Sequence, residues 1–232
     1  MKRFLGLLVM LMIIASNCLA MTFSQPVKIG EIIYPPVGEG MIIKNATYTS
    51  NKPKGNFQKD SLYPNDTLAR FSDGENSIYV HHVKVYNVTP RFGDENINNT
   101  IPVETGLYGI RIFQVKNDSA IKFYLLVTQD ADGRATTWSC IGKKGSQWIK
   151  YFDTKNIRKK YLGDKSGVQC IFSDGVSYEM SGGNSTYART YCKNDTIVME
   201  YRKYEKNITK RGEFRFKWDE SAQWFGVEQV VY

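Results

Sequence analysis

The sequence predicts an all-β fold, an antiparallel sandwich or barrel with at most one short helix. Three observations carry this prediction. Apolar stretches recur every 10 to 15 residues between clusters of Gly, Asn, Asp and Pro. These stretches are rich in Tyr, Phe, Val, Ile and Thr, which suit a pleated, half-buried surface. Several of them alternate apolar and polar residues with a period of two, as strands do.

The expected strands are the stretches in which these features coincide. They cover residues 41–49, 77–88, 107–115, 120–129, 135–141, 147–152, 168–172, 176–180, 187–192, 196–204 and 213–218. In the last stretch, Phe214, Phe216 and Trp218 alternate with charged residues. One apolar face toward the core and one polar face toward solvent are typical of an antiparallel sheet.

Turns, one helix and two loops complete the expected architecture. Hairpin turns are predicted at residues 116–118, 142–145 and 173–175, where Gly, Asn, Asp or Lys separate two strands. Only residues 153–162 predict a helix, with Asp153 or Thr154 as its cap. Residues 51–64 and 89–104 are expected to form long loops. No stretch is typical of a domain linker, so residues 21–232 are expected to form a single extracellular domain.

The first twenty residues have the layout of a cleavable signal peptide. Lys2 and Arg3 precede an apolar run over residues 4–15, and small residues Cys18 and Ala20 stand before the expected cut. The run is too short for a membrane span, which needs roughly 20 apolar residues. We therefore expect the mature chain of 212 residues to be secreted and extracellular, with no membrane span.

The acceptor sequence for N-glycosylation, Asn-x-Ser/Thr, is unusually frequent. It accounts for eight of the fourteen mature asparagines, and seven of the eight motifs use Thr. The acceptors are Asn45, Asn65, Asn87, Asn98, Asn117, Asn184, Asn194 and Asn207. Turns that feed strands also favour Asn and Thr, which explains part of the excess. Modification of most sites is expected, each at an exposed position.

Three cysteines remain in the mature chain: Cys140, Cys170 and Cys192. In an oxidising compartment two of them are expected to pair, and the third to be buried or to form an interchain disulfide. We expect the Cys170–Cys192 pair, because it closes the shortest loop. No metal site is expected, because the cysteines are scattered and the sequence holds only two histidines.

Positive charge is concentrated in the C-terminal half. Residues 21–142 carry 12 basic and 12 acidic residues, whereas residues 143–217 carry 17 and 8. Seven basic residues lie within one short stretch: Arg202, Lys203, Lys206, Lys210, Arg211, Arg215 and Lys217. On neighbouring strands they could form one face that attracts an anionic partner such as a sulfated glycan, although such lysines also serve solubility.

No catalytic motif stands out. His81 and His82 are adjacent in an expected strand, so they would point to opposite faces. The chain has no nucleophile elbow, zinc-protease motif or phosphate loop, and no cofactor is expected. An acidic pair for glycoside hydrolysis cannot be singled out among many Asp and Glu residues.

These features favour a secreted, N-glycosylated, non-enzymatic binding protein. Its expected partner is an extracellular protein or a sulfated, anionic glycan, and not nucleic acid. An immune modulator of a virus or parasite would have this profile. Two further hypotheses are a lipocalin-like carrier of a small ligand, which requires an apolar cavity, and a secreted hydrolase, which requires a histidine or a carboxylate pair in a cleft.

Overall fold

The computed structural model describes eleven segments of the chain. They are residues 21–33, 42–44, 46–48, 68–81, 91–103, 109–129, 135–157, 160–161, 169–172, 190–205 and 208–232. The expected signal peptide, residues 1–20, lies outside them, as do the expected loop at residues 51–64 and the expected strand at residues 176–180. Within the described segments, no helix has the length and apolar character required to cross a membrane.

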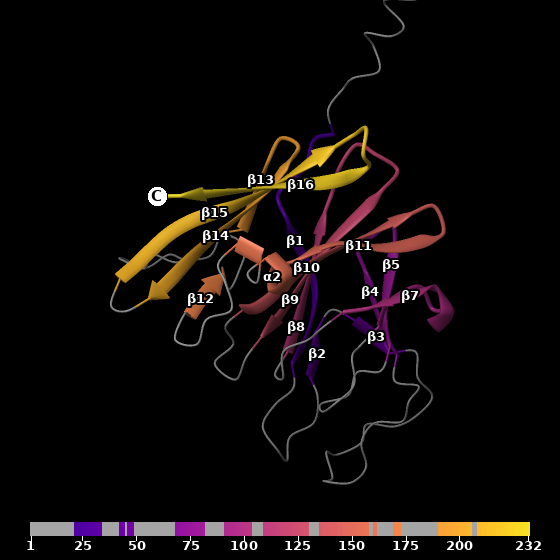
Figure 1. Cartoon of the computed structure of the whole chain (residues 1–232). Coiled ribbons are helices and arrows are strands. Elements are labelled where there is room, and N and C mark those ends of the chain that lie inside the picture. The colour runs from indigo at the N-terminus through magenta and orange to yellow at the C-terminus, as the bar shows by residue number, and fades with distance from the viewer. Residues whose placement is uncertain are drawn as a thin grey trace, which may run out of the picture.

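The described chain forms three antiparallel sheets, which confirms the all-β prediction (Figure 1). The central sheet has the strand order β11-β10-β9-β8-β1-β2. Its strands are β1 (Val27–Ile33), β2 (Ile42–Lys44), β8 (Gly109–Val115), β9 (Lys122–Gln129), β10 (Ala135–Lys144) and β11 (Gln147–Asp153). Each pairs antiparallel with its neighbours, so β2 and β11 are its two described edges.

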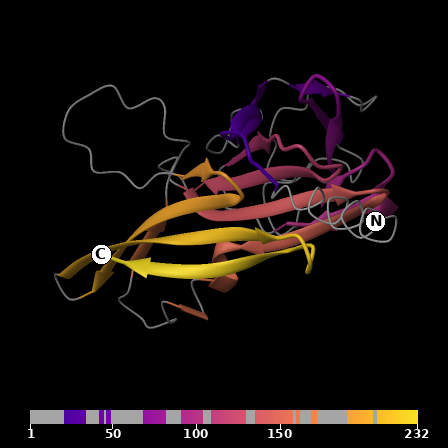
Figure 2. The same cartoon turned by 90° about the horizontal axis from the view of Figure 1, so that it is seen from above.

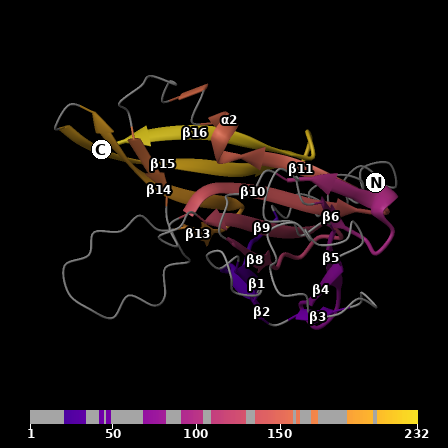
Figure 3. The ribbon, with the colours of Figure 1, turned by 90° about the horizontal axis from the view of Figure 1, so that it is seen from below.

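Two smaller sheets flank the central sheet (Figures 2 and 3). The N-terminal sheet is formed, in order, by β3 (Ala46–Tyr48), β4 (Leu68–Ser72), β5 (Ser77–His81), β6 (Arg91–Gly93) and β7 (Thr100–Pro102), with the 3-10 helix η1 (Ile97–Asn99) between the last two. The C-terminal sheet has the order β12-β14-β15-β16, and β13 also pairs with β14. Its strands are β12 (Gln169–Phe172), β13 (Thr190–Lys193), β14 (Thr196–Glu205), β15 (Ile208–Asp219) and β16 (Trp224–Val231).

Two hydrophobic cores result, one on each face of the central sheet. Phe123 and Leu125 of β9 face the C-terminal sheet and belong to a core that includes Phe216. Tyr124 and Leu126 face the other way, into a core with Phe71 of the N-terminal sheet. Because both faces are covered, β9 is apolar from Phe123 to Val127 and does not alternate with polar residues there.

The N-terminal sheet is held against the central sheet by two close contacts. At Gly30, a Cβ atom would lie only 2.0 Å from Cδ1 of Phe71, so the ring packs directly on the backbone of β1. Asp73, in the turn between β4 and β5, accepts hydrogen bonds from the Gln114 amide and from the Tyr124 hydroxyl at 3.3 Å. Burial and the Asp73 carboxylate both raise the pKa of Tyr124.

Several sequence expectations need correction. Within the expected loop at residues 89–104, residues 91–93, 97–99 and 100–102 form β6, η1 and β7. The strands β1, β4 and β16 were not anticipated. The helix predicted at residues 153–162 is described at α2 (Thr154–Ile157) and at Lys160 and Tyr161, which are also helical, and residues 158, 159 and 162 lie outside the described segments. Its cap is as expected, because Asp153 Oδ1 accepts the Asn156 backbone N–H at 2.7 Å.

The expected Cys170–Cys192 disulfide is not formed in this structure. Cys170 pairs opposite Lys203 and Cys192 opposite Ile197, six residues apart along the same strand β14. Six residues of strand span roughly 20 Å, whereas the Cα atoms of a disulfide lie within about 7 Å. The short sequence separation of Cys170 and Cys192 suggested that the two residues lie close together. They do not, because β12 and β13 pair with different halves of β14. Cys140 and Cys192 are both buried free thiols.

Candidate functional site

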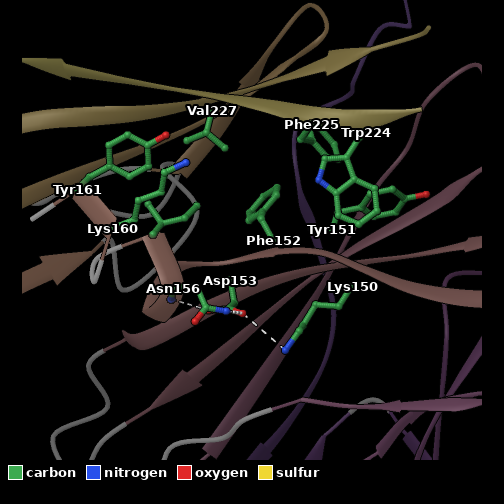
Figure 4. Close-up of a pocket in the computed structure, with 11 residues that line it drawn as sticks. Lys150, Tyr151, Phe152, Asp153, Asn156, Lys160, Tyr161, Trp224, Phe225 and Val227 are labelled. Atoms are coloured by element: carbon green, nitrogen blue, oxygen red, sulfur yellow. Dashed lines mark hydrogen bonds and ion pairs between the residues drawn. The ribbon is translucent and has the colours of Figure 1, made fainter. Parts of the chain in front are cut away.

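A pocket of about 520 Å³ opens at one border of the molecule, between β11, α2 and β16 (Figure 4). Residues 150–153, 156–157 and 160–161 line it from one side, and residues 224, 225 and 227 line it from the other. The two strands are edges of different sheets, β11 of the central sheet and β16 of the C-terminal sheet. The pocket therefore lies where the two layers end together.

An irregular pairing in β11 shapes the first wall. Phe152 pairs with Cys140 and Lys150 with Ile141, so Tyr151 is an extra residue, as in a β-bulge. The bulge turns Tyr151 and Phe152 toward the same core, where both are buried. Lys150 precedes the bulge, and its Nζ lies 3.5 Å from Asp153 Oδ2. The same carboxylate is bonded to the Asn156 side chain at 2.8 Å, which joins the wall to α2.

The opposite wall is the start of β16. Phe225 is buried, whereas Trp224 is 44% exposed. The Trp224 ring lies against Tyr151 with centroids 5.0 Å apart, so the two walls touch at one end of the pocket. Lys160 and Tyr161 lie at the other end, as Figure 4 shows, and the Lys160 ammonium is 5.1 Å from the Tyr161 ring centre.

The electrostatic character of the pocket is basic. Lys150 and Lys160 line it, while Asp153 is the only carboxylate among the described residues of its wall. Both Asp153 oxygens already accept hydrogen bonds from Asn156. The Tyr151 hydroxyl is buried and has no hydrogen-bond partner within the described segments. Burial raises the Tyr151 pKa to about 12, so this group stays neutral near pH 7.

The backbone of β16 has a free side, since β15 alone among the described strands pairs with it. The Tyr232 N–H donates to the Arg211 carbonyl, so Tyr232 and Arg211 form a hydrogen-bonded pair between the two strands. The Trp218 N–H instead donates to the Asp195 carbonyl, so it points away from β16. Hydrogen-bonded and non-bonded pairs alternate along an antiparallel ladder. Trp218 pairs with Phe225, and the register then continues without a shift to Val231. The outward backbone groups therefore belong to Phe225, Val227, Gln229 and Val231.

Four members of the basic stretch predicted from the sequence, Arg202, Arg211, Arg215 and Lys217, share one face of β14 and β15, and this face also carries carboxylates. Arg215 pairs with Glu213 at 2.5 Å and with Glu228 at 3.6 Å, and Lys217 lies 3.6 Å from Asp195. Arg202 and Arg211 are paired across β14 and β15. Lys203 and Lys210 pair one register position further on. Lys206 lies outside the described residues.

The predicted glycan acceptors divide into two groups. Asn45, Asn65, Asn87, Asn184 and Asn207 lie outside the described residues. Asn98 and Asn194 are exposed, Asn194 with φ of 51° in the tight turn between β13 and β14. Asn117 is half-buried, and its Nδ2 donates a hydrogen bond to the Ile121 carbonyl at 2.9 Å.

His81 does not line the pocket. His81 is buried, and its Nε2 lies 2.7 Å from the Asp94 backbone oxygen; His82 lies outside the described residues. The described part of the chain contains no group of three metal-binding side chains.

Sequence reasoning missed the pocket because three distant segments form it. A signal was present in the basic residues of 155–160, beside the predicted helix, but its aromatic partner strand was not anticipated. No protein-family model, curated protein or solved structure matches the chain.

Proposed function

We propose that the chain is a secreted, N-glycosylated, non-enzymatic binding protein, and that its partner is an extracellular protein met at the border between β11 and β16. One observation carries the proposal: a strand edge left unpaired by the described strands and a basic, aromatic pocket lie side by side. Backbone groups of an edge strand can pair with another chain, and an adjoining pocket can select its side chains.

The residue types of the pocket support a recognition role. Trp224 is one of the few large hydrophobic residues that are exposed in the described chain. Tryptophan and tyrosine are favoured at the centres of protein interfaces, where they contribute a large contact area. Lys150 and Lys160 add positive charge that favours an acidic partner.

An anionic glycan is the second candidate, and the same lysines favour it. A sulfated sugar could contact Lys150 and Lys160 while its ring lies against Trp224. This candidate makes no use of the outward backbone groups of β16, so we place it second.

The carrier and hydrolase hypotheses receive less support. Large aromatic side chains such as Trp138, Phe123 and Phe214 fill the described interior, which leaves little room there for the cavity of a carrier. For a hydrolase, His81 would need to reach a cleft, but its ring contacts a backbone carbonyl between strands.

A binding screen tests the proposal. The full mature chain is applied to an array of extracellular protein domains and, in parallel, to an array of sulfated glycans. We expect a protein partner whose binding falls at least about tenfold in Trp224→Ala and in the Lys150→Glu/Lys160→Glu double variant. Lys155→Glu is the matched control, because Lys155 is exposed on α2 and does not line the pocket.

Binding to sulfated glycans alone would contradict the protein proposal. Equal binding by wild type and the Trp224→Ala variant would move the interface away from this border. In both cases the melting temperatures of the variants establish that the fold is intact.

A further inference from the structure

We propose that the partner binds by adding an extended segment to the edge of β16, with an acidic side chain of that segment in the pocket. This inference rests on the function proposed above and specifies how the partner is held.

The edge of β16 has the groups that strand addition needs. Phe225, Val227, Gln229 and Val231 direct an N–H and a carbonyl each away from β15, by the alternation established at Trp218 and Tyr232. An added strand would accept from and donate to these groups in the same way that β15 does on the other side.

The edge also lacks the residues that normally prevent pairing. Edge strands are commonly protected by Lys, Pro, a bulge or short length. β16 has eight residues, of which one is charged, and it contains neither Lys nor Pro. Its register with β15 runs from Trp224 to Val231 without a bulge. The strand is therefore long and regular, and no described strand covers its outer side.

The register explains why the pocket would bind a side chain of the added strand. Phe225 and Val227 have outward backbone groups, and their side chains line the pocket. Residues directly opposite each other on paired strands point to the same face. A partner residue opposite Phe225 or Val227 would therefore direct its side chain toward Lys150 and Lys160. A carboxylate at that position would gain the Lys160 ammonium as a neighbour and would share Lys150 with Asp153.

A second copy of the chain fits this edge less well. The chain has a net charge of +8, so two copies repel each other. The single acidic residue of β16, Glu228, lies on the opposite face and pairs with Arg215. Charge therefore favours a different, acidic protein as the source of the strand.

The experiment uses a random dodecapeptide library displayed on phage and selected on the full mature chain. We expect selected peptides to carry Asp or Glu at alternate positions. In amide hydrogen exchange, bound peptide should slow the exchange of the Phe225, Val227, Gln229 and Val231 N–H groups. The amides of Gly226 and Glu228, which already face β15, serve as the internal comparison.

A matched pair of variants isolates the backbone contact. Val227→Pro removes an N–H that the described fold does not use, and proline is tolerated at strand edges. Val227→Ala shortens the same side chain and keeps the N–H. We expect the peptide to bind Val227→Pro at least about tenfold more weakly than Val227→Ala, since the peptide carbonyl loses its donor.

The outcomes separate the two proposals. Peptides that bind at the pocket without slowing exchange of the four amides, and that bind the two Val227 variants equally, overturn strand addition and leave the protein-binding proposal standing. A chain that selects no peptide and binds only sulfated glycans overturns both.

Discussion

The rings of Phe152 and Phe216 stack in parallel, with centroids 3.8 Å apart and an interplanar angle of 11°. Phe152 belongs to β11 of the central sheet and Phe216 to β15 of the C-terminal sheet, so the contact joins two layers. Phe225 meets the Phe152 ring edge-on at 5.4 Å. Phe152 and Phe225 line opposite walls of the pocket, so their contact, backed by Phe216, sets the separation of the two walls.

Replacing Phe216 by Ala should therefore destabilise the whole sandwich. The ring is fully buried, and deleting a buried aromatic side chain costs about 3–5 kcal/mol of unfolding free energy. Denaturant titration followed by tryptophan fluorescence measures the change. Val27→Ala is the control, because Val27 is 56% exposed and its loss should change stability by less than about 0.5 kcal/mol. A loss below about 1 kcal/mol for Phe216→Ala would mean that this contact is not a core contact.

Gly30→Ala should weaken the attachment of the N-terminal sheet. The added Cβ would lie 2.0 Å from the Phe71 ring, so the ring or the strand must move. Overpacking of this kind costs about 1–3 kcal/mol. Thermal unfolding should show a lower midpoint for Gly30→Ala, and Phe71→Leu in the same chain should restore part of the loss. If the stability loss of the double variant equals the sum of the losses of the two single variants, the clash between the added Cβ and the Phe71 ring is not the cause of the destabilisation.

Cys140 and Cys192 should be unreactive in the folded protein. Burial raises the Cys192 pKa to about 12, and burial together with Cys192 raises the pKa of Cys140 well above its ordinary value. The thiolate is the reactive form, so iodoacetamide at neutral pH should modify neither residue until denaturant is added. Mass spectrometry of peptides measures this. If modification in denaturant also requires a reductant, one of the two thiols is in a disulfide.

Local patterns predicted most of the central sheet and the two long strands of the C-terminal sheet. The expected stretches at residues 107–115, 120–129, 135–141 and 147–152 overlap β8, β9, β10 and β11. The alternation in residues 196–204 and 213–218 matches β14 and β15, because each has one core face. The run from Tyr124 to Val127 has no alternation, because side chains on both faces of β9 are buried. β16 was missed because Gly226 interrupts a short pattern near the C-terminus.

The candidate site depended on information that no local pattern contains. The pocket requires that β11 and β16, edges of different sheets, lie at the same border of the molecule. The carboxylates around the basic stretch were not anticipated for a related reason. Arg215 and Lys217 lie close together in the sequence, which suggested one cationic group. In the fold, Arg215 lies beside Glu213 and Glu228, and Lys217 lies beside Asp195.

The sequon excess predicts a glycoprotein, and Asn98 offers a clear test. The Asn98 side chain is exposed within η1, so a glycan can be attached without disturbing the core. Protein secreted from eukaryotic cells should lose several glycans on treatment with an N-glycan-removing enzyme. Asn98→Gln should reduce the mass of the untreated protein by one glycan and leave the treated mass nearly unchanged. An untreated mass equal to that of the bare polypeptide would contradict the prediction.

The Tyr151 hydroxyl should make the protein sensitive to alkaline pH. Its folded pKa is raised to about 12, and an unfolded tyrosine has a pKa of about 10. Above about pH 10 the unfolded state loses this proton while the folded state keeps it. The unfolded state then binds fewer protons, so the free energy of unfolding falls as the pH rises from about 10 to about 12.

Tyr151→Phe isolates this effect from the other tyrosines. Tyr124 and Tyr232 also have raised pKa values and remain in the variant, so they contribute equally to both proteins. Denaturant titrations at several pH values should show a shallower decline above about pH 10 for Tyr151→Phe than for wild type. Near pH 7 the variant should be as stable as wild type or more so, because the buried hydroxyl lacks a partner among the described residues. A marked loss of stability at pH 7 would instead reveal a hydrogen bond to this hydroxyl in the folded protein, and its pKa would then need another explanation than burial.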